Sequence, residues 1–176
     1  SFAAEKEFTE TAINAMQGAF FVQDEQGRLV RWNKALEAIW GKGAAGPLGG
    51  KAAEIVHPED RAGFAAALAE APQAGFATTE ARLVPRSGGE GRLYSLTGTT
   101  MVIEGRTYLV VSGIDITRRK GMENTLRTAA VEWAATFDAI HDCIMILDPE
   151  YRILSCNAAT PRFTGPPSQQ AGRMSA

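Results

Sequence analysis

Few residues in this sequence carry side chains suited to catalysis or metal binding. There are two cysteines, Cys143 and Cys156, and two histidines, His57 and His141. Cysteine and histidine side chains bind metals or take part in redox reactions when several of them recur at short, regular spacing, and no such spacing occurs here. The sequence also has no Gly-rich phosphate loop and no nucleophile elbow. We therefore expect no catalytic residues and no metal site in this chain, and a structural role for His141.

The two cysteines fall in short apolar segments on either side of Pro149-Glu150. If these two residues form a two-residue hairpin loop, Cys143 and Cys156 face each other across an antiparallel pair. Two readings follow: neighbouring free thiols or a redox pair. A reducing compartment disfavours the disulfide.

Composition places the chain among folded globular proteins. Hydrophobic residues make up 45% and charged residues 22% of 176 residues, and the net charge is −2. This balance gives no basic surface for nucleic acid and no polybasic patch for a membrane. The apolar runs are far shorter than the roughly 20 residues of a membrane helix, and the opening segment SFAAEKEF does not have the pattern expected of a signal peptide. We expect a fragment of a longer polypeptide, since the chain does not begin with Met, and a cytoplasmic setting, since two cysteines are too few for a disulfide scaffold.

An internal repeat organises the sequence. Residues 13–41 align without a gap to residues 137–165, always at an offset of 124. Identical pairs are Ala15/Ala139, Asp24/Asp148, Arg28/Arg152, Asn33/Asn157, Ala35/Ala159 and Gly41/Gly165. This period is too long for a solenoid and suits a small domain followed by a linker. The second copy then has room for only the beginning of a domain.

The periodicity of apolar residues predicts an α+β domain in the first copy. A helix over 2–16 precedes two short strands, 19–24 and 28–33, joined by a turn that contains Gly27. Asn33 is expected to cap a following helix, a loop surrounds 46–50, and a further helix starts near His57-Pro58 and runs to Pro72. Three long strands follow, over 75–85, 92–103 and 106–116, and Gly-containing turns between them predict an antiparallel meander.

A long helix is predicted after Thr117. Its apolar positions step by four and three residues, as in the seam of a coiled coil: Met122, Leu126, Ala129, Trp133, Thr136 and Ile140. We therefore expect a parallel homodimer through this helix and the helix over 2–16. Gly121 and Thr136 weaken the seam, so the association is expected to depend on concentration.

Three motifs in this order resemble the PAS family. They are FFVQDEQGRLVRWNKA, VHPEDR before the long helix, and GIDITRRKGMENTLR at the end of the meander. The resemblance covers residues 10–120 and, more weakly, 137–165. It implies a five-stranded antiparallel sheet with short helices on one face. The corresponding division is a flanking helix over 1–16, a sensor domain over 17–117, a signalling helix over 118–140 and the start of a second PAS domain over 141–176.

The resemblance also implies roles for particular residues. Asp115, Ile116 and Thr117 would couple the last strand to the outgoing helix, and Asn33 and Asn157 would cap helices. Between the helices and the sheet, candidate interior residues are Phe20, Val22, Trp32, Phe64, Leu68, Tyr108, Val110 and Ser112. These residues form either a packed core or the wall of a ligand cavity. In a cavity, Ser112, Tyr108 and the Trp32 N–H would orient a small molecule.

The function implied is a non-catalytic sensory or regulatory module. It would sense a small ligand or mediate dimerisation, and pass the signal to an effector domain of the same polypeptide. By analogy this effector is a histidine kinase or, second, a diguanylate cyclase. Alternatives are a cofactor-binding PAS protein with His57 as a haem ligand, and a module that only sets dimer geometry. Nothing resembles the Cys-containing flavin motif of light-sensing members, so no cofactor is predicted, and the identity of any ligand stays open.

Overall fold

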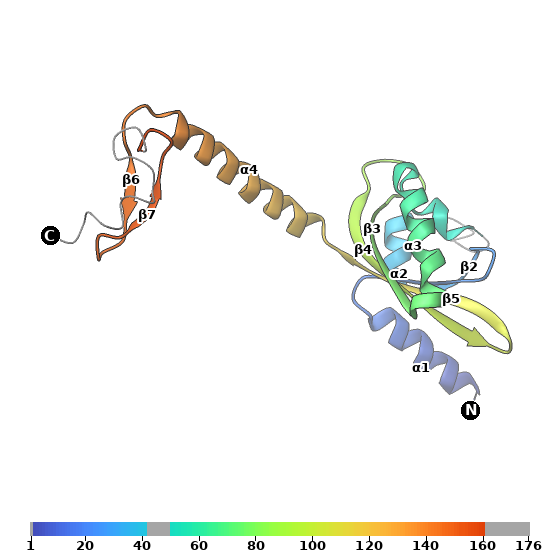
Figure 1. Ribbon diagram of the computed structural model, residues 1–176. Helices are drawn as coiled ribbons and strands as arrows, with labels where there is room; N and C mark the ends of the chain where they lie inside the picture. The colour runs from blue at the N-terminus through green and yellow to red at the C-terminus, as the bar shows by residue number, and fades with distance from the viewer. Residues whose placement is uncertain (1, 42–49, 161–176) are drawn as a thin grey trace. The chain divides into compact units, whose positions relative to one another are not determined.

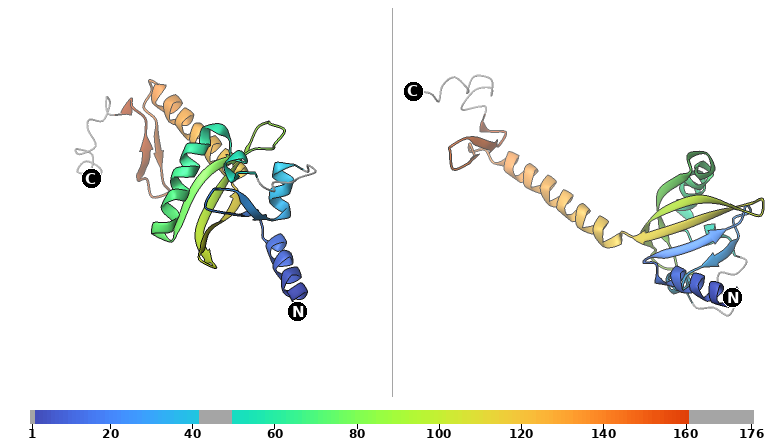
Figure 2. Two further views of the ribbon diagram at one scale, coloured as in Figure 1. Left: turned by 90° about the vertical axis from the view of Figure 1, so that its right-hand side faces the viewer. Right: turned by 90° about the horizontal axis from the view of Figure 1, so that it is seen from below.

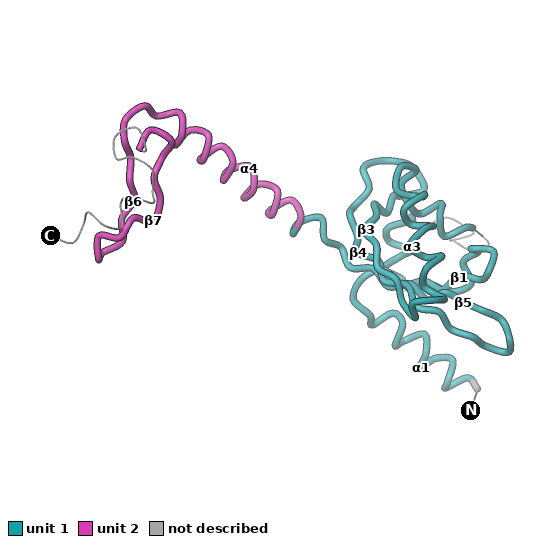
Figure 3. The backbone as a smooth tube through the Cα atoms, in the orientation of Figure 1, with its two compact units in different colours: residues 1–119 teal, residues 120–176 magenta. Residues whose placement is uncertain are grey.

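The computed structural model describes residues 2–41 and 50–160 of the chain, which divides into two compact units. Unit 1 covers Ser1–Arg119 and unit 2 covers Lys120–Ala176 (Figure 3). The predicted loop at 46–49, Gly165 and the rest of the second copy after residue 160 lie outside the described residues. Within the described ranges, no helix is long and apolar enough to cross a membrane.

Unit 1 contains a five-stranded antiparallel sheet and its helices (Figure 1). Along the chain the elements are α1 (Phe2–Ala15), β1 (Ala19–Gln23), β2 (Leu29–Trp32), α2 (Lys34–Trp40), the short 3-10 helices η1 (Ala52–Glu54) and η2 (Pro58–Asp60), α3 (Arg61–Ala74), β3 (Phe76–Leu83), β4 (Arg92–Ile103) and β5 (Arg106–Asp115). The strand order is β2-β1-β5-β4-β3, so the first strand of the chain lies beside the last one.

The predicted elements begin and end at residues whose chemistry explains the boundaries. Asn33 caps α2, because its side-chain oxygen accepts a hydrogen bond from the Leu36 N–H at 3.0 Å. The helix predicted to end at Pro72 continues two residues further to Ala74, with Pro72 inside its last turn. It stops at Gly75, which takes a left-handed conformation with φ 84°. Gly27, with φ 75°, forms the expected turn between β1 and β2.

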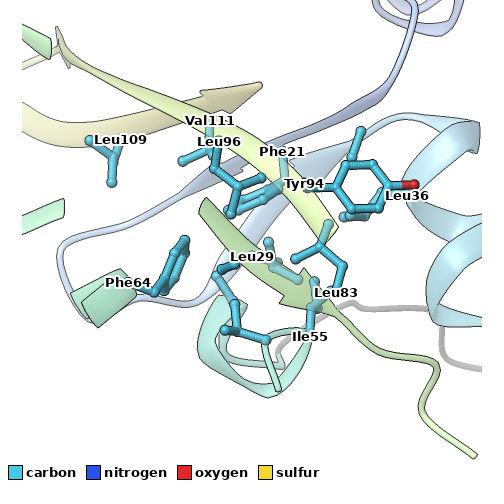
Figure 4. Packing of buried hydrophobic residues seen from close by; sticks show 14 of the residues in the cluster. Phe21, Leu29, Leu36, Ile55, Phe64, Leu83, Tyr94, Leu96, Leu109 and Val111 are labelled. Carbon is cyan, nitrogen blue, oxygen red and sulfur yellow. The ribbon is translucent and has the colours of Figure 1, made fainter. Parts of the chain in front are cut away.

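The core of unit 1 lies between one face of the sheet and the helices α2 and α3, which cover that face (Figures 1 and 2). Phe21, Leu96 and Val111 point from β1, β4 and β5 toward Leu29, Ile55 and Phe64 (Figure 4). Most of these side chains are fully buried, and each contributes about 1.5 to 3 kcal/mol relative to exposure. This cluster fixes the sheet, and through it the positions of both ends of β4 and β5.

In unit 2, the chain repeats the local structure that opens unit 1. The helix α4 (Thr117–Ala139) leads into the hairpin of β6 (Met145–Leu147) and β7 (Ile153–Cys156). Asp148 accepts hydrogen bonds from the Glu150 and Arg152 N–H groups, as Asp24 does from Gln26 and Arg28. Both hairpins also carry a register shift at the same position of the repeat, between Val22 and Gln23 and between Ile146 and Leu147. The repeat read from the sequence is therefore a repeat in structure over residues 137–160.

Candidate functional site

A hydrogen-bonded junction links the last strand of the sheet to the outgoing helix. Asp115 ends β5 and Thr117 begins α4. The Asp115 carboxylate accepts a hydrogen bond from the Thr117 N–H at 2.9 Å. The Thr117 hydroxyl oxygen accepts one from the Leu93 N–H of β4 at 2.9 Å. The first turn of α4 is thus fastened to two neighbouring strands.

Ile116 sits between these two polar residues and anchors the junction. Its side chain is buried, and its backbone N–H donates to the Leu93 carbonyl at 2.8 Å. The three predicted coupling residues are therefore all hydrogen-bonded to the start of β4 or to each other. Sequence reasoning missed Leu93 and Arg92, which lie more than twenty residues away along the chain and carry no local signal.

Electrostatics favour the ionised form of Asp115. Burial acts to raise the pKa of this carboxyl, but the hydrogen bonds from Thr117 and the nearby Arg92 guanidinium outweigh it and leave the pKa below its ordinary value. Arg92 Nη1 lies 3.4 Å from Asp115 Oδ2. Because the Arg92 side chain is 74% exposed, this ion pair itself contributes little to stability.

The start and the end of the sheet domain approach each other closely beside this junction. Ala19 of β1 pairs with Gly113 of β5. Gly18 has φ +93°, and a Cβ added there would lie 2.1 Å from the Gly113 carbonyl oxygen. Only glycine fits at this position, because both the backbone conformation and the space exclude a side chain. The chain therefore enters the sheet next to the strand from which α4 leaves.

A pocket of about 660 Å³ lies between α3, the turn after β1 and the far ends of β4 and β5. Its apolar wall includes Phe64, Leu68 and Leu109, and its polar residues include Thr107 and Tyr108. Such a combination of apolar surface and a few polar groups is typical of small-molecule sites. Thr100, also in the wall, has a buried hydroxyl without a hydrogen-bond partner among the described residues.

The structure brings only part of the predicted interior set to this pocket. Phe64, Leu68 and Tyr108 line it. Phe20 and Val22 are buried, but they pair with Ser112 and Val110, respectively, and these four residues lie on the sheet face opposite the core cluster. The correct inward residues of these strands are Phe21, Leu109 and Val111, because side chains alternate along a strand and the prediction was out of phase by one residue.

The remaining predicted polar groups have other partners. The Trp32 Nε1–H donates to Glu37 at 3.0 Å, and Trp32 packs against the core without lining the pocket. His57 does not line it either: its Nδ1 accepts from the Glu59 N–H at 3.4 Å and caps η2. No group of three potential metal ligands occurs within residues 2–41 and 50–160.

Next to His57, Asp60 and Arg82 form a paired carboxylate and guanidinium. Arg82 Nε and Nη2 each donate to Asp60 at 2.8 Å, and the Arg82 backbone N–H adds a third bond of 2.8 Å. These hydrogen bonds lower the pKa of Asp60 to about 2 against the opposing effect of burial. The pair ties the start of α3 to β3, so it supports the helix that forms one wall of the pocket.

The predicted dimer seam lies on an exposed helix. Met122, Leu126 and Trp133 are exposed side chains of α4, and the Trp133 ring stacks on Phe137 with centroids 5.5 Å apart. Ile140 follows the helix, which ends at Ala139.

In the second copy, Cys143 and Cys156 are free and do not face each other. Cys156 pairs with Met145, and the Cys143 thiol contacts Thr160 Oγ1 at 3.4 Å. The expected pairing is wrong because the turn is longer than two residues and the register shift between Ile146 and Leu147 moves the strands. Asn157 is buried and accepts from the Thr160 hydroxyl and the Ile144 N–H; the segment it was expected to cap lies largely outside the described residues.

Comparisons with known proteins agree with this arrangement. A family model described as PAS fold matches residues 13–121. A PAS domain from Colwellia psychrerythraea is 20% identical, with a TM-score of 0.56, over 65% of this chain and 98% of that one. A PAS domain from a two-component sensor histidine kinase is 20% identical, with a TM-score of 0.55, over 65% and 99%. At such identities, the likeness concerns the fold alone. No curated protein matches the sequence.

Proposed function

The chain belongs to the PAS fold family, and from this premise we propose that residues 17–117 form a sensor that binds a small, largely apolar ligand in the pocket beside α3. PAS domains are in general non-catalytic. The ligand state would be passed through Asp115, Ile116 and Thr117 to α4 and then to an effector domain of the same polypeptide, with a histidine kinase as the first candidate.

One observation carries this proposal: the same two strands form the pocket and the junction. Thr107, Tyr108 and Leu109 line the pocket at one end of β5, and Asp115 ends that strand. On β4, Thr100 lines the pocket, while Leu93 holds Thr117. A ligand that shifts the paired strands at one end therefore acts on elements that hold the helix at the other. Packed sheets transmit such displacements because their interiors have few voids.

The outgoing helix supports a second part of the proposal, association with a second copy of the chain. Leu126 and Trp133 are 70% and 60% exposed, and they occupy one seam of α4 at the spacing of a coiled coil. A seam of this kind is complementary to itself in a parallel pair. Dimerisation would bring the first turns of two α4 helices together directly after the junction.

The pocket is tested by blocking it. Leu68→Trp adds a large ring at the pocket wall, and Val102→Trp places the same ring at an exposed position outside the pocket. In a thermal-shift screen of small molecules, a ligand at 100 times its Kd stabilises the folded state by about 2.7 kcal/mol. We expect this stabilisation in the parent and in Val102→Trp, but not in Leu68→Trp.

Native mass spectrometry of the same three proteins measures the bound mass directly. Equal ligand retention by the parent and Leu68→Trp would place binding elsewhere and contradict the pocket assignment. A screen in which the folded parent binds no compound would contradict ligand sensing and leave dimerisation as the function to test.

A further inference from the structure

The last turn of α1 is tied to the first residue of α2 by side-chain hydrogen bonds. Asn14 Oδ1 accepts from the Lys34 N–H at 2.9 Å. The buried Asn33 donates from Nδ2 to the Gly18 carbonyl at 2.9 Å and to the Ile13 carbonyl at 3.5 Å. The helix α1, the hairpin of β1 and β2, and the helix α2 are therefore joined at two adjacent residues, Asn33 and Lys34.

Two of these three hydrogen bonds recur in unit 2 at the constant offset of the repeat, and the third has a different carbonyl partner. Asp138 Oδ1 accepts from the Ala158 N–H, also at 2.9 Å. The buried Asn157 donates to the Ile140 and Asp142 carbonyls at 3.0 and 2.8 Å. Asp138 corresponds to Asn14 and Ala158 to Lys34, since each pair of numbers differs by 124. Asn14 and Asp138 are different residue types, but in each a side-chain oxygen accepts a hydrogen bond from one backbone N–H.

The position of Asp138 is unfavourable for α4 considered alone. A carboxylate in the last turn of a helix faces the negative end of the helix dipole. Asp138 lies in that turn, directly before the last helical residue, Ala139. Its hydrogen bond to the Ala158 N–H offsets this cost, because a bond from N–H to a carboxylate is stronger than one between neutral groups. The geometry is therefore explained by the tie to the hairpin and not by the stability of the helix.

We propose that Asp138 and Asn157 are positioning residues that lock the end of α4 to the hairpin of β6 and β7, as Asn14 and Asn33 lock α1 to the hairpin of β1 and β2. Held at Thr117 by the junction and at Asp138 by this lock, α4 delivers a rotation of its first turn to the hairpin that follows. This second statement rests on the proposed sensor function, whereas the lock itself does not.

The lock is tested by amide hydrogen exchange in the 176-residue chain, without any ligand. Asp138→Ala should speed exchange of the Ala158 amide about tenfold, because the amide loses its acceptor. Asp138→Asn keeps an acceptor oxygen and should restore most of the protection. Glu132→Ala, at an exposed acid of the same helix, controls for the change in charge and should leave Ala158 unchanged.

In unit 1, Asn14→Ala should have the same effect on the Lys34 amide. Unchanged exchange at Ala158 in Asp138→Ala, or equal acceleration in Glu132→Ala, would overturn the lock.

Transmission is tested in the full-length protein through the output of its effector. Asp138→Ala should reduce the response to ligand at least severalfold, and Asp138→Asn should retain it. A normal response in Asp138→Ala, with accelerated exchange at Ala158, would refute delivery through this lock. A parent protein that gives no response at all would refute the sensor function, and the exchange measurement would still decide whether the lock exists.

Discussion

Replacing Asp115 with alanine is expected to loosen the start of α4 while the sheet stays folded. The substitution removes the acceptor of the Thr117 N–H and the partner of Arg92. Loss of an acceptor at a helix start costs about 1 kcal/mol. Loss of an exposed ion pair adds about 0.5 kcal/mol or less. None of the core residues around Phe21 and Leu96 depends on these bonds.

Hydrogen exchange measures the loss of this interaction both at the start of α4 and in the middle of the sheet. In Asp115→Ala, the amides in the first turn of α4 should exchange about five to ten times faster than in the parent. The Val111 amide in the middle of the sheet reports global unfolding and should change by the full loss in stability, about 1 to 1.5 kcal/mol. Asp115→Asn keeps an oxygen for the Thr117 N–H and should lose about 0.5 kcal/mol or less.

The pH dependence gives a second check on the same variant. The pKa of Asp115 is lowered by folding, so the ionised carboxylate stabilises the folded state above the unfolded pKa. This contribution is lost as the pH falls through the folded pKa. The difference in stability between the parent and Asp115→Ala should therefore be largest near pH 7 and shrink in acid. An equal difference at pH 7 and below pH 3, or no difference at either, would refute the electrostatic part of this reasoning.

Further predictions concern the supporting structure, the dimer and the cofactor. Asp60→Asn should lower the stability of unit 1 at pH 7 by about 1 kcal/mol, a modest loss because solvent reaches 23% of the Asp60 side chain. The pKa of Asp60 in the folded protein, about 2, lies below the unfolded value, so this difference should vanish in urea titrations as the pH falls from about 4 toward 2. Gly18→Ala should lower the stability of unit 1 by more than about 2 kcal/mol, because the added Cβ would clash with Gly113. Gly121→Ala meets no neighbour within 4 Å and should stabilise α4 by up to about 1 kcal/mol. Both are measured by thermal unfolding, and equal effects would contradict the close approach at Gly18. Leu126→Glu combined with Trp133→Glu should convert a concentration-dependent dimer to monomer in sedimentation, and an equally dimeric double variant would exclude the α4 seam. The purified protein should show no Soret band, since His57 caps η2 outside the pocket; a band of stoichiometric intensity would refute this.

The sequence by itself predicted the fold and its repeated opening segment. Strand and helix patterns, the turn at Gly27 and the cap at Asn33 depend on neighbours within a few residues, so local chemistry decides them. The repeat predicted a second hairpin, because the aspartate, arginine and asparagine that shape the first one recur at a constant spacing. The resemblance to the PAS family pointed to the segment Asp115 to Thr117, and its hydrogen bonds to the start of β4 are seen in the structure, whereas its coupling role stays a prediction.

Only the tertiary structure decided which strand residues face the core and which partners complete the site. The register shifts after Val22 and after Ile146 change the pairing of each hairpin, and no local pattern located them. Phe20 and Val22 are as apolar as Phe21, so composition could not tell the inner face of β1 from the outer one. Leu93 and Thr117 meet because β4 pairs with β5. Contacts of this kind depend on long-range packing, whose energy is spread over the whole sheet and leaves no signal at a single position.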